Sequence, residues 1–324
     1  MMRKVLRIFA ALLLVPFLPT GSPAAEPSWP PVLTLGTASP GGTYFAYGEG
    51  LAQILTRALG IMVVARPTEG PSQNILLLES GEIQLGLVTL GVALQGWNGS
   101  APWTGGRQLR AMRAMFPMYD TPFQFMVPDS SPAKSLSGLN GLKVGVGPQG
   151  GTTAAYVPEF FKRLKIEASL VTGEWAELAK QVAAGTLEGL AVGAGVPFPS
   201  FLDLERKMRV RYLPVEPQQI LDLRLAMPEL GASTVGAGAY PSMRRNYPTV
   251  GLYNFAVAHR DLPADLVAAI VDAVFANHDA LIDIHPAAAE TVPENFTRNP
   301  FLPFHDGASR WYQAQGVLGV THGD

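Results

Sequence analysis

Three turns in the sequence combine glycine with hydroxyl or amide side chains directly before a helix-like segment: residues 41–44, 70–74 and 150–153. The first backbone N–H groups of a helix have no partner inside the helix and carry a partial positive charge, so they attract anions. Each turn taken alone is also compatible with an ordinary capped helix. If the three turns face one cleft, we expect them to hold a carboxylate without a buried arginine.

The segment from Gly145 to Gly150 reads G-x-G-x-x-G between a strand-like and a helix-like segment. In that context the motif is typical of dinucleotide sites, where the glycines let the backbone approach a pyrophosphate, and Glu167 follows as a compatible acid. The motif lies in the middle of the chain, however, and Pro148 stiffens a loop that must curve around phosphate. A nucleotide-cofactor enzyme is therefore the alternative interpretation, and binding of a smaller anion by the same loop is favoured.

Other patterns that carry chemistry are missing from the sequence. The five histidines lack i, i+4 metal spacing, and no H-E-x-x-H, G-x-S-x-G or G-x-x-x-x-G-K-[ST] motif occurs. Acidic residues are scattered, and His305 within the segment 303–307 is interpreted as a helix cap. We therefore expect no catalytic residue, no metal and no cofactor, and a protein that captures a ligand without changing it.

Composition excludes further classes of protein. The 24 Lys+Arg and 26 Asp+Glu give a formal net charge of −2, and no basic stripe is present, so we expect no nucleic-acid partner. Without cysteine the chain has no thiolate site and no residue to carry the lipid of a bacterial lipoprotein. The 324 residues are 48% hydrophobic, which suits about two domains with large cores.

The N-terminus has the layout of a secretory signal peptide. Arg3, Lys4 and Arg7 precede an apolar stretch over residues 8–18, and small residues run through Ala25. A membrane anchor is the alternative, but the apolar stretch is shorter than the roughly 20 residues that a spanning helix needs. We expect a cleavable signal peptide over residues 1–25, a periplasmic location, and a mature chain with 21 Lys+Arg against 26 Asp+Glu.

The remaining chain must supply the elements that position these turns. Strand-like segments cover residues 32–35, 61–65, 85–90, 142–146 and 190–192. Helix-like segments alternate with them over residues 44–59, 72–78, 152–164 and 175–184. The alternation predicts an α/β fold with parallel strands. In such sheets ligands bind outside the carboxyl ends of the strands.

Two apolar strands, residues 123–127 and 252–258, are each followed by a polar turn. We interpret them as hinge strands, where the chain crosses between two lobes once in each direction. Lobe 1 is then expected to contain residues 26–127 and 253–324, and lobe 2 residues 128–252. A helix over residues 263–284 should follow the second strand, and the Gly-, Ala- and Pro-rich stretch 231–247 is expected to be loop or lobe-edge backbone.

Several segments resemble the TAXI family, the extracytoplasmic solute receptors of tripartite ATP-independent periplasmic (TRAP) transporters. They are residues 36–37, 41–45, 68–74, 80–88, 139–147, 150–153 and 303–308, with Trp311 and Tyr312. The likeness covers nearly all of the expected mature chain in order. The Gly-Gly-Thr-Tyr turn and the tail segment 303–308 carry most of it.

The resemblance implies a type II periplasmic-binding-protein fold that closes at a hinge and delivers a carboxylate, such as glutamate or 2-oxoglutarate, to a membrane permease driven by an ion gradient. Its partners would be a small organic anion and the TRAP permease subunits, and we expect a monomer. A receptor of the same fold that serves a sensor kinase is an alternative. Leu90, expected near the cleft, departs from the polar pair usual in the family and favours a less polar or aromatic acid.

The turns and strand ends together define a predicted ligand site. Tyr44 and Phe198 are the favoured aromatic residues, because each lies just past a glycine-rich turn at a strand end. The full predicted set is Thr37, Gly42, Thr43, Tyr44, Ser72, Asn74 and Thr89 from lobe 1, and Gly151, Thr152, Thr153, Gly195 and Phe198 from lobe 2.

Overall fold

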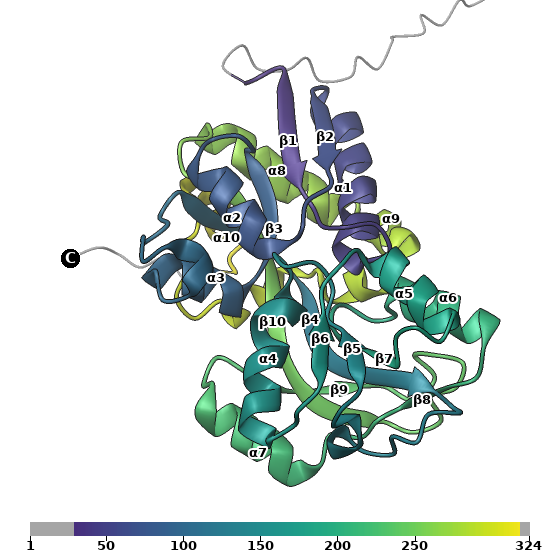
Figure 1. Cartoon of the computed structure of the whole chain (residues 1–324). Coiled ribbons are helices and arrows are strands. Elements are labelled where there is room, and N and C mark those ends of the chain that lie inside the picture. Colours follow the sequence, from purple (N-terminus) through teal and green to yellow (C-terminus); the bar gives the residue numbers. More distant parts are fainter. Residues whose placement is uncertain (1–28, 318–324) are drawn as a thin grey trace, which may run out of the picture.

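The computed structural model describes residues 29–317 as two α/β lobes joined by two long strands (Figure 1). The two-lobed α/β fold expected from the sequence is confirmed. The expected signal peptide over residues 1–25 lies outside the described residues. Between residues 29 and 317, no helix combines the length and apolar character that a membrane crossing requires.

The upper lobe in Figure 1, called lobe 1, is built from the two ends of the described chain. Its strands are β1 (Val32–Gly36), β2 (Met62–Arg66) and β3 (Leu85–Thr89). Its helices are α1 (Thr43–Leu59), α2 (Pro71–Glu79), α3 (Leu90–Asn98), α8 (Ala264–Ala276), α9 (His278–Ile284) and α10 (Asp306–Ala314). Short 3-10 helices cover Pro102–Thr104, Pro286–Glu290 and Pro293–Arg298.

The lower lobe, called lobe 2, is one continuous stretch between the two long strands. Its strands are β5 (Lys143–Gly145), β6 (Ser169–Val171), β7 (Gly189–Gly193), β8 (Val210–Tyr212) and β9 (Gly231–Val235). Its helices are α4 (Thr152–Leu164), α5 (Trp175–Ala183), α6 (Pro199–Lys207) and α7 (Pro217–Ala226), with a 3-10 helix at Leu136–Leu139.

The long strands β4 (Met112–Pro128) and β10 (Tyr247–His259) run through both lobes in the sheet order β2-β1-β3-β10-β4-β7-β5-β6. They pair antiparallel, from Gly251 opposite Pro122 to His259 opposite Met112. From residue 123 onward β4 pairs with β7, and up to residue 251 β10 pairs with β9. The chain therefore changes lobe near residues 120–123 and 251–254. The division of lobe 1 and lobe 2 at residues 127/128 and 252/253 stays a prediction.

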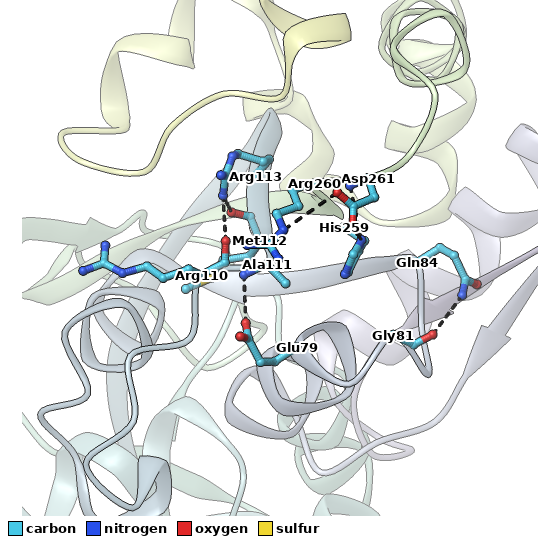
Figure 2. Close-up of polar contacts among 10 residues, drawn as sticks. All are labelled: Glu79, Gly81, Gln84, Arg110, Ala111, Met112, Arg113, His259, Arg260 and Asp261. Atoms are coloured by element: carbon cyan, nitrogen blue, oxygen red, sulfur yellow. Dashed lines mark hydrogen bonds and ion pairs between the residues drawn. The ribbon is translucent and has the colours of Figure 1, made fainter.

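The lobe-1 ends of β4 and β10 are fixed by polar contacts, and Figure 2 shows the residues involved. Ala111 N donates to a Glu79 carboxylate oxygen at 2.8 Å, and Arg260 N donates to Ala111 O at 2.8 Å. The Arg113 guanidinium donates to the carbonyl oxygens of Arg110 and Met112. Because these ends are tied into lobe 1, bending between the lobes is expected at the crossings instead.

The helices that begin at the cleft follow from clear amphipathic patterns. In α1 the residues Tyr47, Leu51 and Leu55 are buried, and Gly60 ends the helix in the left-handed conformation at φ 67°. In α4 the buried face includes Tyr156 and Phe160. Burial of one apolar stripe fixes each helix against its sheet, and this places the helix N-terminus at the edge of that sheet.

Three expectations about elements differ from the structure. The first hinge strand begins at Met112, not at residue 123; Pro117 and Pro122 interrupt its pattern, yet both lie within the β4–β10 ladder. Residues 231–235 are the strand β9 and not loop, because the lobe-2 half of β10 supplies a pairing partner. The helix expected over residues 263–284 is divided into α8 and α9 at Asn277, whose side chain donates to Ala273 O.

Candidate functional site

A cavity of about 40 Å³ lies between the two lobes. Nine of the twelve predicted site residues line it: Gly42, Thr43, Tyr44 and Thr89 from lobe 1, and Gly151, Thr152, Thr153, Gly195 and Phe198 from lobe 2. Their roles in binding stay a prediction, but the structure brings these nine together from five separate segments.

Six helices begin at the wall of this cavity. Thr43, Pro71, Thr152 and Trp175 line it and are the first residues of α1, α2, α4 and α5, while Thr89 and Phe198 line it and directly precede α3 and α6. None of the six has a side-chain hydrogen bond at its N-cap. The partial positive charges of the helix ends therefore face a common space.

No Lys, Arg or His residue is among those that line the cavity, and Glu69 is the one charged side chain there, for residues 29–317. The attraction for an anion must therefore come from backbone N–H groups. Within the same range the N–H groups of Tyr44 and Thr153 have no acceptor. They lie in the first turns of α1 and α4, one from each lobe.

Hydroxyl groups hold the lobes together across the cleft. Thr43 Oγ1 donates to Gly195 O at 2.8 Å, and Ser200 Oγ donates to Gly41 O at 2.9 Å. Thr89 Oγ1 and Thr152 Oγ1 are 3.1 Å apart and share a hydrogen bond. The lobes are therefore in contact, which is the closed arrangement expected of a two-lobed binding protein.

His285 adds a further bridge between the lobes. The ring is buried, and its Nε2 lies 3.0 Å from Pro197 O of lobe 2, while Nδ1 accepts a hydrogen bond from Ala287 N. With Nδ1 as acceptor, Nε2 carries the proton and donates to Pro197 O. Burial lowers the pKa of His285, partly opposed by the Pro197 carbonyl, so the ring favours this neutral form.

Tyr44 connects the cavity to the hinge strands. Its hydroxyl donates to Asn254 Oδ1 at 2.5 Å, and Asn254 Nδ2 donates to Thr121 Oγ1 at 2.6 Å and to Tyr119 O at 2.5 Å. Burial raises the pKa of Tyr44 well above its ordinary value, so the phenol remains protonated and keeps its donor role. Asn254 and Thr121 belong to β10 and β4, at the point where the chain changes lobe.

Trp175 and Phe198 form the aromatic part of the lobe-2 wall, with ring centroids 5.1 Å apart in an edge-to-face arrangement. Trp175 also covers the loop of the dinucleotide-like motif, since a Cβ on Gly147 would lie 2.3 Å from its ring. At the other end of the motif, Gly150 O accepts hydrogen bonds from Ser72 N and Ser72 Oγ. The loop that the nucleotide alternative requires is therefore occupied by protein groups.

Three predicted site residues do not line the cavity. Thr37 Oγ1 donates to Arg66 O, and Asn74 Nδ2 donates to Thr37 O and Leu87 O, so both side chains serve the lobe-1 backbone. Ser72 contacts lobe 2 next to the cavity. Leu90, expected near the cleft, directly follows the cavity residue Thr89 but does not line the cavity itself; it lines a second groove beside the hinge strands.

That second groove contains a pair of carboxyl groups at the hinge. Asp120 accepts hydrogen bonds from Ser233 of lobe 2 and from Thr121 N, and its own N–H donates to Glu290 Oε2 at 3.3 Å. Burial raises the pKa of Asp120, although the hydrogen bonds and the charge of Arg298 oppose the effect. Burial and the Asp120 charge likewise raise the pKa of Glu290.

The predicted site set did not include Glu69, Thr121 and Trp175, which all line the cavity. Glu69 directly precedes the glycine of a turn that was singled out, so its position was a usable signal. Trp175 begins a predicted helix, which was a weaker signal. Thr121 lies between an aspartate and a proline within β4, and no local pattern marks it.

Two α/β lobes joined by crossing strands, with a cavity at the junction, define the two-lobed fold of periplasmic binding proteins. The chain belongs to the NMT1-like family, which matches residues 35–316. No curated protein matches the sequence.

Several solved structures share this fold. MatC from Rhodopseudomonas palustris with bound malate has a TM-score of 0.59 at 14% identity, over 89% of this chain and 99% of its own. A protein of R. palustris with adipate has a TM-score of 0.58 at 19% identity, over 89% and 97%. A periplasmic transporter structure reaches 0.53 at 14% identity, over 92% and 99%. At these identities the likeness concerns the fold.

Proposed function

We propose that this protein is an extracytoplasmic solute-binding receptor that captures a small carboxylate-bearing metabolite between its lobes and delivers it to a membrane permease. The observation that carries the proposal is the meeting of six helix N-termini at one cavity between two lobes. Such helix ends bind carboxylates through backbone N–H groups. Malate and adipate in the two R. palustris structures support a carboxylate as the ligand class.

In this proposal the ligand carboxylate receives hydrogen bonds from the free N–H groups of Tyr44 and Thr153, one from each lobe. Trp175 and Phe198 pack against the apolar part of the ligand. A ligand bound to both lobes stabilises the closed form, because it contacts that form more extensively than the open one.

The finer assignment that we propose is a TAXI receptor of a TRAP transporter, acting as a monomer in the periplasm after removal of residues 1–25. The glycine-rich turns at residues 41–45 and 150–153 support it, because they resemble that family and also line the cavity. A permease is the partner that such a receptor requires.

A thermal-shift screen of the exported full chain tests the ligand class. We expect carboxylates to raise the unfolding temperature, since ligand at a hundredfold excess over its Kd stabilises a protein by roughly 2.7 kcal/mol. Isothermal titration would then give the Kd of each acid. Neutral sugars and amines serve as controls, and stabilisation by those compounds alone would overturn the carboxylate assignment.

A further inference from the structure

Glu69 carries the one charge on the cavity wall described above, and it lies in the turn between β2 and α2. Its backbone N–H donates to Gln73 Oε1 at 2.7 Å, which fixes the turn. The side chain crosses to lobe 2, since a Cβ on Gly150 would lie 2.8 Å from Glu69 Cβ and 3.2 Å from Oε2. The carboxylate is therefore at the seam, beside the loop that leads into α4.

Among residues 29–317, the Glu69 carboxylate does not stabilise the fold through any polar contact. No hydrogen bond and no ion pair to it occurs in this range. Glu79 and Glu188, by contrast, accept hydrogen bonds from the backbone N–H groups of Ala111 and Lys143. Because no protein group in this range pairs with the Glu69 carboxylate, its charge can act on a bound solute.

Glu69 also borders the approaches to the cavity. It lines two outer grooves in addition to the inner cavity. Glu174 lies in the first of these grooves and Glu229 in the second. Glu69 thus borders the inner cavity and both outer grooves.

The charges on the wall favour a ligand with one carboxylate. The free N–H groups of α1 and α4 stabilise the first negative charge, but no cationic side chain lines the cavity to receive a second. A second carboxylate of the same small ligand stays close to Glu69, whose exposed carboxylate repels it. At such separations, within about 10 Å, salt screens the repulsion only partly.

We propose that Glu69 is a specificity-determining residue that selects monocarboxylates over dicarboxylates of the same chain length. This inference rests on the proposed function. It predicts that the wild-type protein binds butanoate and hexanoate more tightly than succinate and adipate. Neutralising Glu69 should reduce this preference for monocarboxylates, because the Glu69 carboxylate repels the second carboxylate of a dicarboxylate most strongly.

Isothermal titration of the full chain with these two matched pairs of acids is the test. Glu69→Gln should lower the ratio of dicarboxylate Kd to monocarboxylate Kd by roughly fivefold to tenfold, as expected when one partly screened charge at this range is removed. Glu69→Asp keeps the charge and should keep most of the preference. Glu174→Gln is the matched control, because it removes a charge from the outer groove without changing the cavity wall.

The possible results separate the two proposals. If both acids of a pair bind and Glu69→Gln leaves their ratio within twofold of the wild type, the role of Glu69 is overturned while carboxylate binding stands. An equal shift in Glu174→Gln would also overturn it, since any acidic residue near the cleft would then suffice. If no acid binds the wild type or any variant, the proposed function fails together with this inference.

Discussion

At the scale of single residues, the threonines at the starts of α1 and α4 have two separate tasks. Their hydroxyl groups bond across the cleft, from Thr43 to Gly195 O and from Thr152 to Thr89. The backbone of the same first turns supplies the free N–H groups that we assign to the ligand. A hydroxyl side chain after a glycine-rich turn can therefore stabilise closure while the peptide groups beside it bind the ligand.

The double variant Thr43→Ala with Thr152→Ala should weaken ligand binding by about tenfold to thirtyfold. It removes two hydrogen bonds between the lobes, each of which contributes about 1 kcal/mol net. Isothermal titration with the acid found in the screen measures the loss. Thr186→Ala with Thr297→Ala is a suitable control, because both hydroxyl groups lie on the surface away from the cleft. Unchanged affinity in the first pair would refute the site.

His285 should make closure sensitive to acid. The pKa of His285 is lowered from 6.5 in the closed form, so this form favours the neutral ring. The resulting stabilisation of the closed form is complete above pH 6.5 and is lost as the pH falls through the lowered pKa. Protonation of Nδ1 also breaks the hydrogen bond from Ala287 N. Ligand affinity measured from pH 7.5 to 5 should therefore fall, and His285→Gln should flatten the curve. An identical slope in the variant would exclude this histidine as the cause.

At the scale of elements, the sequence predicts regular helices well and the crossing strands poorly. The expected bounds 152–164 agree with α4, because one apolar stripe and a glycine-rich start define that helix locally. The first half of β4 carries Pro117 and Pro122, and prolines argue against a central strand unless the partner is known. Helices α6 and α7 were missed, because their exposed residues dilute the apolar pattern.

The same distinction between local and distant signals explains the site. Glycine-rich turns at strand ends are visible in the sequence, and they supplied nine residues of the cavity wall. The side chains of Thr37 and Asn74 have the same chemistry but serve the backbone of lobe 1, which no local pattern reveals. Thr121 reaches the cavity only because β4 crosses between the lobes at that point.

The hinge carboxyl Asp120 should reduce stability at neutral pH. The pKa of Asp120 is raised, so the folded protein binds the carboxyl proton more tightly than the unfolded chain does. The stabilisation that this proton gives the folded state at low pH is lost as the pH rises through the raised pKa. Asp120→Asn should therefore unfold a few degrees higher than the wild type at pH 7, and the gain should vanish near pH 3.5. Thermal denaturation at both pH values checks this.

Asp283→Asn is the control for that experiment, because it neutralises an exposed carboxyl on α9 outside the hinge groove. The explanation through Asp120 fails if both variants gain the same stability at pH 7, or if Asp120→Asn loses stability there.

At the scale of the whole molecule, closure depends on how closely two backbones approach at the seam. Gly70 has φ 126°, which strongly favours glycine, and a Cβ there would lie 3.1 Å from both Gly150 O and Gly151 Cα of lobe 2. Gly70→Ala should therefore hold the lobes apart. We expect at least a tenfold loss of affinity, and no decrease in radius of gyration by X-ray scattering when the ligand is added.

Gly81→Ala provides the matched control, at the other end of the same helix. Gly81 also has a positive φ, 75°, but nothing lies within 4 Å of the added Cβ. Both variants carry a backbone penalty, which is larger at Gly70 because φ 126° with ψ −157° is allowed almost only to glycine. Only Gly70→Ala adds a contact between the lobes. Equal losses of affinity in both would show that backbone strain, and not lobe approach, is responsible.

The double crossing by β4 and β10 has a consequence for how the protein is made. Lobe 2 is continuous in the sequence, whereas lobe 1 needs both ends of the described chain, because α1 packs on α8 and the Tyr47 hydroxyl bonds to Thr291. A chain emerging from its N-terminus presents β1, α1 and β2 long before the segments that cover them. Lobe 2 can therefore complete its fold first, while β1, α1 and β2 stay uncovered until α8 and the segment around Thr291 have been made.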